Sequence, residues 1–143
     1  MKAFYSEIEI DAPAEVVWSH VTDLAHYGEW HALIPAISGE LQEGAILEMR
    51  VTGVTRPMQA KVLRLEPGRE LAMLAIWPLG LVRPVHTQRV EPLDDGRTRY
   101  VCTETFAGLL LPLIAGKLED NVKPLYRATC AALKARVEGI EPG

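Results

Sequence analysis

The sequence is poor in cysteine and in clustered basic residues, and each scarcity excludes a class of protein. Cys102 and Cys130 are the only cysteines and form no CxxC motif, so a disulfide-rich scaffold is not predicted. Asp and Glu (19) outnumber Lys and Arg (15), giving a net charge of −4. Because phosphate binding usually needs a basic face, and no dense run of Lys or Arg occurs, we expect no nucleic-acid partner.

The sequence also lacks a long apolar run. Its longest, residues 71–82, contains Pro78 and Gly80 and is shorter than the ~20 residues that span a bilayer. The first residues reach Glu7 without an apolar core, so no signal peptide is expected. These features predict a protein without a membrane span, and we expect it in the cytoplasm.

Established catalytic and cofactor motifs are missing too. No GxSxG, HExxH, phosphate-binding or dinucleotide-binding pattern occurs, and no cofactor is predicted. The histidines show no tight metal-ligand spacing; they are His20, His26, His31 and His86. We therefore predict no metal site.

What is present is the composition of an ordinary folded domain. Of the 143 residues, 48% are hydrophobic and 24% are charged, close to the average for globular domains. A chain of this length can bury a sizeable core. We predict a single domain over residues 1–143.

The first 35 residues predict a strand, a helix and a link. Hydrophobic residues alternate over residues 4–10, which is typical of a half-buried strand. Pro13 suits the first position of a helix. The link over residues 26–35 carries Trp30, expected at the mouth of a cavity or in the core, and His31, expected to be exposed, with a place facing the pocket as the alternative.

The middle of the chain predicts an antiparallel meander. Short turns separate segments rich in β-branched residues, and Asp95-Gly96 is a strong hairpin signal. The predicted strands cover residues 37–41, 45–52, 58–66, 70–77, 84–92 and 97–107.

The last third predicts a long amphipathic helix. Apolar residues recur at helical spacing from Leu118 to Val137, and Gly139 is placed to end the helix. Pro124 predicts a kink, a junction of two helices or a tolerated bend. The apolar segment 108–116 before it is interpreted as a gate over a pocket, a contact in a possible homodimer, or simply the start of a bent helix. The order of elements favours a two-layer α+β fold.

Three segments resemble the START-like (SRPBCC) superfamily of polyketide cyclases, lipid-transfer domains and birch-pollen-allergen-like proteins. They are IDAPAEVVWSHVTDLAHYGEWHALIP (residues 10–35), VHTQRVEPLDDGRTRYVCTETFAGLL (85–110) and LEDNVKPLYRATCAALKARVE (118–138). The resemblance implies a helix-grip fold, in which a curved antiparallel sheet wraps a long C-terminal helix and encloses a cavity. It leaves three functions open: binding or transfer of a small hydrophobic or amphipathic molecule, a cyclase- or dehydratase-like enzyme, and a protein-interaction module.

His86 and Glu104 are the candidate catalytic pair. Counting from the Asp95-Gly96 turn places them opposite each other on neighbouring strands. A carboxylate beside an imidazole in an apolar pocket can transfer protons, and it can equally order a cavity wall or hydrogen-bond a ligand.

A small-molecule pocket is expected between the long helix and the sheet. Its candidate ligand-binding residues, for which ordinary core packing is the alternative, are Trp30, Met49, Met73, Trp77, His86, Tyr100, Glu104 and Tyr126.

Overall fold

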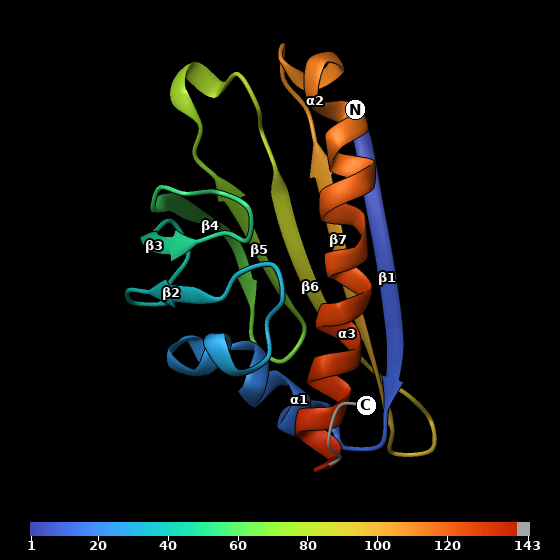
Figure 1. Cartoon of the computed structure of the whole chain (residues 1–143). Helices are drawn as coiled ribbons and strands as arrows, with labels where there is room; N and C mark the ends of the chain where they lie inside the picture. Colours follow the sequence, from blue (N-terminus) through green and yellow to red (C-terminus); the bar gives the residue numbers. More distant parts are fainter. Residues whose placement is uncertain (140–143) are drawn as a thin grey trace.

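The computed structural model describes residues 1–139 and consists of one curved sheet, a long C-terminal helical run and short helices at its ends (Figure 1). The strands are β1 (Lys2–Ile10), β2 (Ala36–Ser38), β3 (Ile46–Arg50), β4 (Met58–Glu66), β5 (Glu70–Ala75), β6 (Val85–Pro92) and β7 (Thr98–Phe106). The helices are α1 (Ala14–Val21), η1 (Leu24–Glu29), η2 (Pro78–Gly80), α2 (Leu111–Lys117), η3 (Leu118–Val122) and α3 (Lys123–Glu138).

The sheet is fully antiparallel, with the strand order β1-β7-β6-β5-β4-β3-β2. Strands β2 to β7 follow one another as the predicted meander, and β1 joins the far edge of the sheet beside β7. Helix α3 runs along β1 and β7 on the concave side, while α1 and η1 close the lower end in Figure 1. The helix-grip fold predicted from the sequence is confirmed.

Alternation within the strands explains why one face of the sheet is buried. On β7, Thr98, Tyr100, Cys102, Glu104 and Phe106 all point inward and are buried. Successive side chains of a strand point to opposite faces, so this set covers one side of the sheet. The face that α3 covers therefore carries both apolar side chains and the carboxylate of Glu104.

The helical run has an irregular turn just before Pro124 and extends further toward the N-terminus than predicted. It begins at Leu111, passes through a π-helical turn at Leu118–Val122, and continues as α3, with Pro124 in the first turn of α3. Proline has no backbone N–H to donate and its ring clashes with the carbonyl four residues earlier. The π turn relieves this conflict by widening the helix before Pro124. The run ends at Gly139, whose φ of 72° is the left-handed conformation expected at a helix end.

A hydrogen-bonded chain of side chains crosses the core between the sheet and α1. The Tyr100 hydroxyl donates to Gln88 Oε1, Gln88 Nε2 donates to the Tyr27 hydroxyl, and Tyr27 donates to the carbonyl oxygen of Val21. All three side chains are fully buried. Since buried polar groups are costly unless they are paired, this chain secures η1 and α1 against the sheet.

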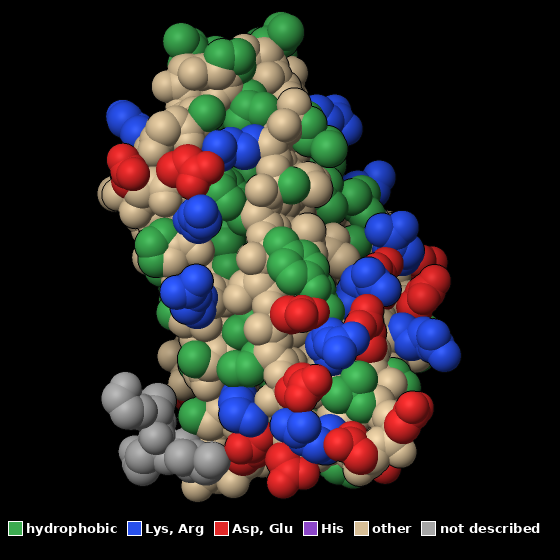
Figure 2. Space-filling view, turned by 90° about the vertical axis from the view of Figure 1, so that its right-hand side faces the viewer, with side chains coloured by type: hydrophobic (Ala, Val, Ile, Leu, Met, Phe, Trp, Pro, Cys, Tyr) green, Lys and Arg blue, Asp and Glu red, His purple; other side chains and the backbone are tan. Residues whose placement is uncertain are grey.

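The end of the molecule that holds α2 and η2 exposes large apolar side chains. Leu79, Leu109 and Leu113 are 94%, 85% and 77% exposed. Figure 2 shows hydrophobic side chains at this end, above a face on which Lys and Arg alternate with Asp and Glu. No helix within residues 1–139 is long and apolar enough to cross a membrane.

Candidate functional site

A cavity of about 110 Å³ lies between the sheet and the helical run. Strands β3 to β7 form its wall, and the residues before β2, the β3–β4 loop, the segment between β5 and β6 and the π turn complete it. The lining is almost entirely apolar and consists of Leu33, Ile34, Met49, Val51, Thr52, Val54, Met58, Met73, Ala75, Trp77, Pro84, His86, Glu104, Phe106, Leu118 and Val122.

The cavity is smaller than the roughly 300–1,000 Å³ of typical ligand pockets. An apolar cavity of about 150 Å³ can hold a benzene ring, so the free cavity approaches the size of a single ring. Three methionines, Met49, Met58 and Met73, lie in the wall. Methionine adapts its shape readily, so these side chains give the cavity room to adjust to a ligand.

Five of the eight residues predicted to bind ligand line the cavity: Met49, Met73, Trp77, His86 and Glu104. The other three are buried elsewhere in the core. Trp30 packs edge-on against Tyr27, with ring centroids 5.2 Å apart, and Tyr100 lies in the hydrogen-bonded chain that contains Gln88. Tyr126 stacks on Phe4 at 5.7 Å.

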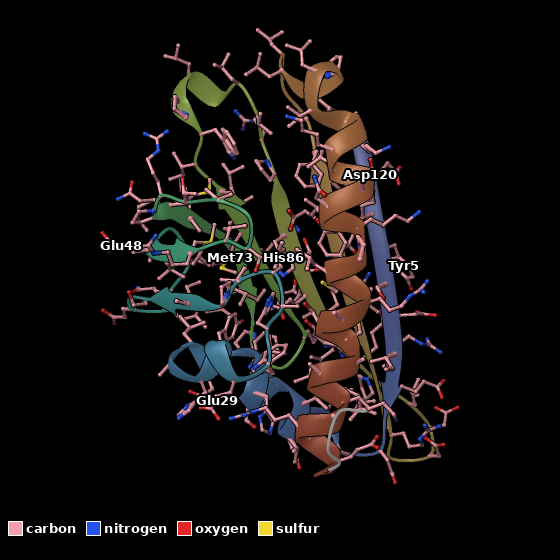
Figure 3. All side chains as sticks on the ribbon, in the orientation of Figure 1. Tyr5, Glu29, Glu48, Met73, His86 and Asp120 are labelled. Carbon is pink, nitrogen blue, oxygen red and sulfur yellow. The ribbon has the colours of Figure 1, made fainter. Side chains whose placement is uncertain are left out.

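His86 and Glu104 are the polar pair of the cavity wall. They face each other in the register of β6 and β7, as predicted, and His86 Nδ1 lies 2.8 Å from Glu104 Oε1. His86 is 5% and Glu104 is 6% exposed. An ionised carboxylate only accepts hydrogen bonds, so Nδ1 carries the proton and the ring is held in one orientation. Figure 3 shows His86 beside Met73 in the middle of the molecule, between the sheet and α3.

His86 Nε2 is buried and has no hydrogen-bond partner within the described part of the chain. With Nδ1 protonated, neutral His86 keeps a lone pair on Nε2. This nitrogen can therefore accept a hydrogen bond from a ligand or take up a proton from it.

The prediction that His31 is exposed is wrong: it is 3% exposed and lies beside His86. After η1 the chain turns back toward the sheet, and the His31 backbone N–H donates to the carbonyl oxygen of Tyr27 at 2.8 Å. The imidazole stacks on the Tyr27 ring at 4.8 Å, and Nδ1 accepts the backbone N–H of Ile34 at 3.0 Å. Burial, and next the nearby His86, hold the pKa of His31 well below its usual value, so the ring is neutral.

Tyr126 places another polar atom near the pair. Its hydroxyl is buried and forms no hydrogen bond of normal geometry among residues 1–139. Burial, and then the charge of Glu104, raise the pKa of this hydroxyl, which therefore stays protonated. Within the described residues, the Nε2 atoms of His31 and His86 and the Tyr126 hydroxyl are thus buried without partners, and of these three residues only His86 lines the cavity.

The wall residues that were not predicted come from loops, from the helical run and from the strand positions Met58, Ala75 and Phe106. Leu33 and Ile34 precede β2, Val54 lies in the β3–β4 loop, and Leu118 and Val122 belong to the π turn. Leu118 and Val122 both belong to the apolar stripe of the predicted helix, which is a signal for burial. The two loop contributions had no such signal, because loop residues show no periodicity.

The fold and the cavity together define a helix-grip domain with an apolar internal cavity. The chain belongs to the polyketide cyclase / dehydrase and lipid transport family, whose sequence model matches residues 1–138. This confirms the START-like (SRPBCC) resemblance drawn from the three segments. No curated protein matches the sequence significantly.

Solved structures share the fold at low sequence identity. The ZhuI aromatase/cyclase of Streptomyces sp. R1128 is 21% identical, with a TM-score of 0.76 over 96% of this chain and 93% of that chain. Norcoclaurine synthase of Thalictrum flavum is 18% identical, with a TM-score of 0.70 over 96% and 94% of the two chains. The di-domain aromatase/cyclase BexL is 15% identical, with a TM-score of 0.71 over 94% of this chain and 47% of that chain. These likenesses show the fold.

Proposed function

We propose that this protein binds a small apolar or amphipathic molecule in its cavity and that His86 and Glu104 contact the polar group of that molecule. The observation that carries the proposal is an apolar cavity whose wall includes one buried hydrogen-bonded His–Glu pair with a free ring nitrogen. Pockets for small molecules combine apolar walls with a few placed polar groups in this way. A module that acted only through its surface would need neither the cavity nor the pair.

A second candidate is an enzyme that transfers a proton inside the cavity. It is favoured by the geometry of the pair, since Glu104 orients His86 and leaves Nε2 as a base in apolar surroundings. The family to which the chain belongs includes cyclases and dehydrases as well as lipid-transport proteins, and the ZhuI and BexL structures are of aromatase/cyclases. Binding is the requirement common to both candidates, so it is tested first.

Toluene is a suitable first probe because it is apolar and one ring in size. We expect a titration followed by NMR to shift the signals of cavity residues such as Met73 and Val54. The variant Val54→Trp places a large ring at the wall and should abolish these shifts. The matched control Thr55→Trp adds the same ring to the same loop at an exposed position outside the wall, and should bind as the original protein does. The binding proposal is wrong if toluene shifts no signal of a cavity residue. It is also wrong if toluene shifts the Met73 signals equally in Val54→Trp and in the original protein.

Acetophenone tests the enzyme candidate, because a base that removes its α-proton allows deuterium to replace that proton in D₂O. We expect the protein to accelerate this exchange and His86→Gln to lose the acceleration, as measured by proton NMR. If the original protein exchanges the acetophenone protons no faster than Val54→Trp does, binding is the only supported function.

A further inference from the structure

Two histidines from distant parts of the sequence meet beside the cavity. The ring centroids of His31 and His86 lie 5.3 Å apart, with the rings at 63° to each other. Both side chains are more than nine-tenths buried. The Nε2 atom of each is buried and lacks a hydrogen-bond partner in the described residues. His86 belongs to the cavity lining, whereas His31 lies beside His86 and is not part of the lining. Native structures rarely bury polar atoms unpaired, so two such nitrogens on adjacent rings need an explanation.

The partners of the two Nδ1 atoms determine what each Nε2 can do. His31 Nδ1 accepts a hydrogen bond from the backbone of Ile34, so the proton of the neutral ring sits on Nε2, which is a donor. His86 Nδ1 donates to Glu104, so its Nε2 carries a lone pair and is an acceptor. The structure thus presents one free donor and one free acceptor on adjacent rings.

A hydroxyl group matches this arrangement because it accepts and donates at once. A ketone or an ether can only accept, and an indole N–H can only donate. Two hydrogen bonds of about 2.8 Å to one oxygen join nitrogen atoms roughly 4.5 Å apart, a separation that two imidazole rings with centroids 5.3 Å apart can provide.

We propose that His31 and His86 together bind a hydroxyl group on the cavity ligand, which makes the ligand a small hydroxylated ring, such as a phenol or an enol. The hydroxyl oxygen accepts from His31 Nε2–H and its proton is donated to His86 Nε2. This inference rests on the proposed binding function and adds the chemical class of the ligand. Tyr126, whose hydroxyl also lacks a partner in the described residues, lies outside the cavity lining and serves as a control.

Phenol and toluene distinguish this inference from the binding function, because they have nearly the same size and differ in the hydroxyl group. We expect phenol to bind at least ten-fold more tightly than toluene, with both dissociation constants measured by NMR titration. Sites built to hydrogen-bond a hydroxyl discriminate strongly against the analogue that lacks it. A purely apolar cavity would prefer toluene, since phenol must leave its water behind.

Two variants remove one ring nitrogen each and keep the other hydrogen bond. In His31→Asn the amide oxygen can still accept the N–H of Ile34, and in His86→Asn the amide nitrogen can still donate to Glu104. Each variant should lose the preference for phenol while binding toluene as before. Tyr126→Phe should keep the preference. Thermal denaturation of each variant checks that it is folded.

The outcomes separate the two proposals. If toluene binds and phenol binds no more tightly, the hydroxyl inference is overturned and the binding function stands; a water molecule held between the two histidines would give this result. If both Asn variants keep the preference for phenol, the inference is overturned as well. If neither probe binds, the binding function itself fails.

Discussion

His31 should make the protein sensitive to mild acid. The pKa of this buried histidine is held well below its usual 6.5, first by burial and then by His86. In the unfolded chain the same imidazole has its ordinary pKa and takes up a proton as the pH falls below about 6.5. The unfolded state therefore binds more protons than the folded state in this range, so the free energy of unfolding decreases as the pH falls.

The magnitude follows from proton linkage. For a group that stays neutral in the folded state and has a pKa of about 6.5 when unfolded, the loss of stability between pH 7 and pH 5 is about 2 kcal/mol. His20, whose pKa is also lowered, adds a loss of the same sign. His26 acts in the opposite direction, because its hydrogen bond to Asp23 raises its pKa. The carboxyls of Glu119 and Glu138 have lowered pKa values and act at lower pH.

Urea denaturation at pH 7, 6 and 5, followed by tryptophan fluorescence, measures this dependence. We expect His31→Asn, which keeps an acceptor for the Ile34 N–H and does not titrate, to lose about 2 kcal/mol less than the original protein between pH 7 and pH 5. His26→Asn is the control. It should not reduce the pH dependence of the free energy of unfolding, because His26 is exposed and its pKa is raised rather than lowered. An equal loss of stability in His31→Asn and the original protein would refute the reasoning.

Three further substitutions test the packing around the site by the same denaturation assay. Tyr126→Phe removes a buried hydroxyl that has no partner and should raise the stability by about 1 kcal/mol; a loss would mean that the hydroxyl is paired in solution. Gln88→Leu leaves two tyrosine hydroxyls without their amide partner and should lower the free energy of unfolding by about 2–4 kcal/mol. An unchanged stability would contradict the role given to the hydrogen-bonded chain of Tyr100, Gln88 and Tyr27. Gly108→Ala should cost about 1–3 kcal/mol, because φ is 114° and the new Cβ would lie 2.4 Å from the carbonyl oxygen of Leu81. In the helical control Gly116→Ala nothing lies within 4 Å of the new Cβ, and it should stabilise by about 0.5–1 kcal/mol; equal effects of the two alanines would contradict the steric argument.

The placement of His86 opposite Glu104 could be predicted because it depends only on local rules. Asp95-Gly96 identifies the hairpin, and counting outward from a turn gives the register of two antiparallel strands. Alternation then gives the face on which each side chain lies. Pro124 was likewise identifiable as an irregularity, since proline is incompatible with the interior of a regular α-helix.

The burial of His31 could not be predicted by such rules. It depends on how the link after η1 turns back onto the sheet, and on contacts with Tyr27 and His86 that are remote or irregular in sequence. A polar residue in a link is normally exposed, and no pattern within residues 26–35 distinguishes this one. The size of the cavity could not be predicted from the sequence either, because it depends on how loops and the π turn close over the sheet.

The π turn at Leu118–Val122 has a geometric consequence for the whole helical run. A π turn closes its hydrogen bonds one residue further along the chain than an α-helical turn does. One residue corresponds to a rotation of about 100° around an α-helix, so the faces of α2 and α3 are out of phase by that amount. Deleting a single residue within the turn would restore a regular helix and rotate α2 relative to α3, turning Leu118 away from the cavity. The side of α3 that packs on the sheet and the side of the run that covers the cavity are therefore rotated relative to each other, although they belong to one continuous helical run.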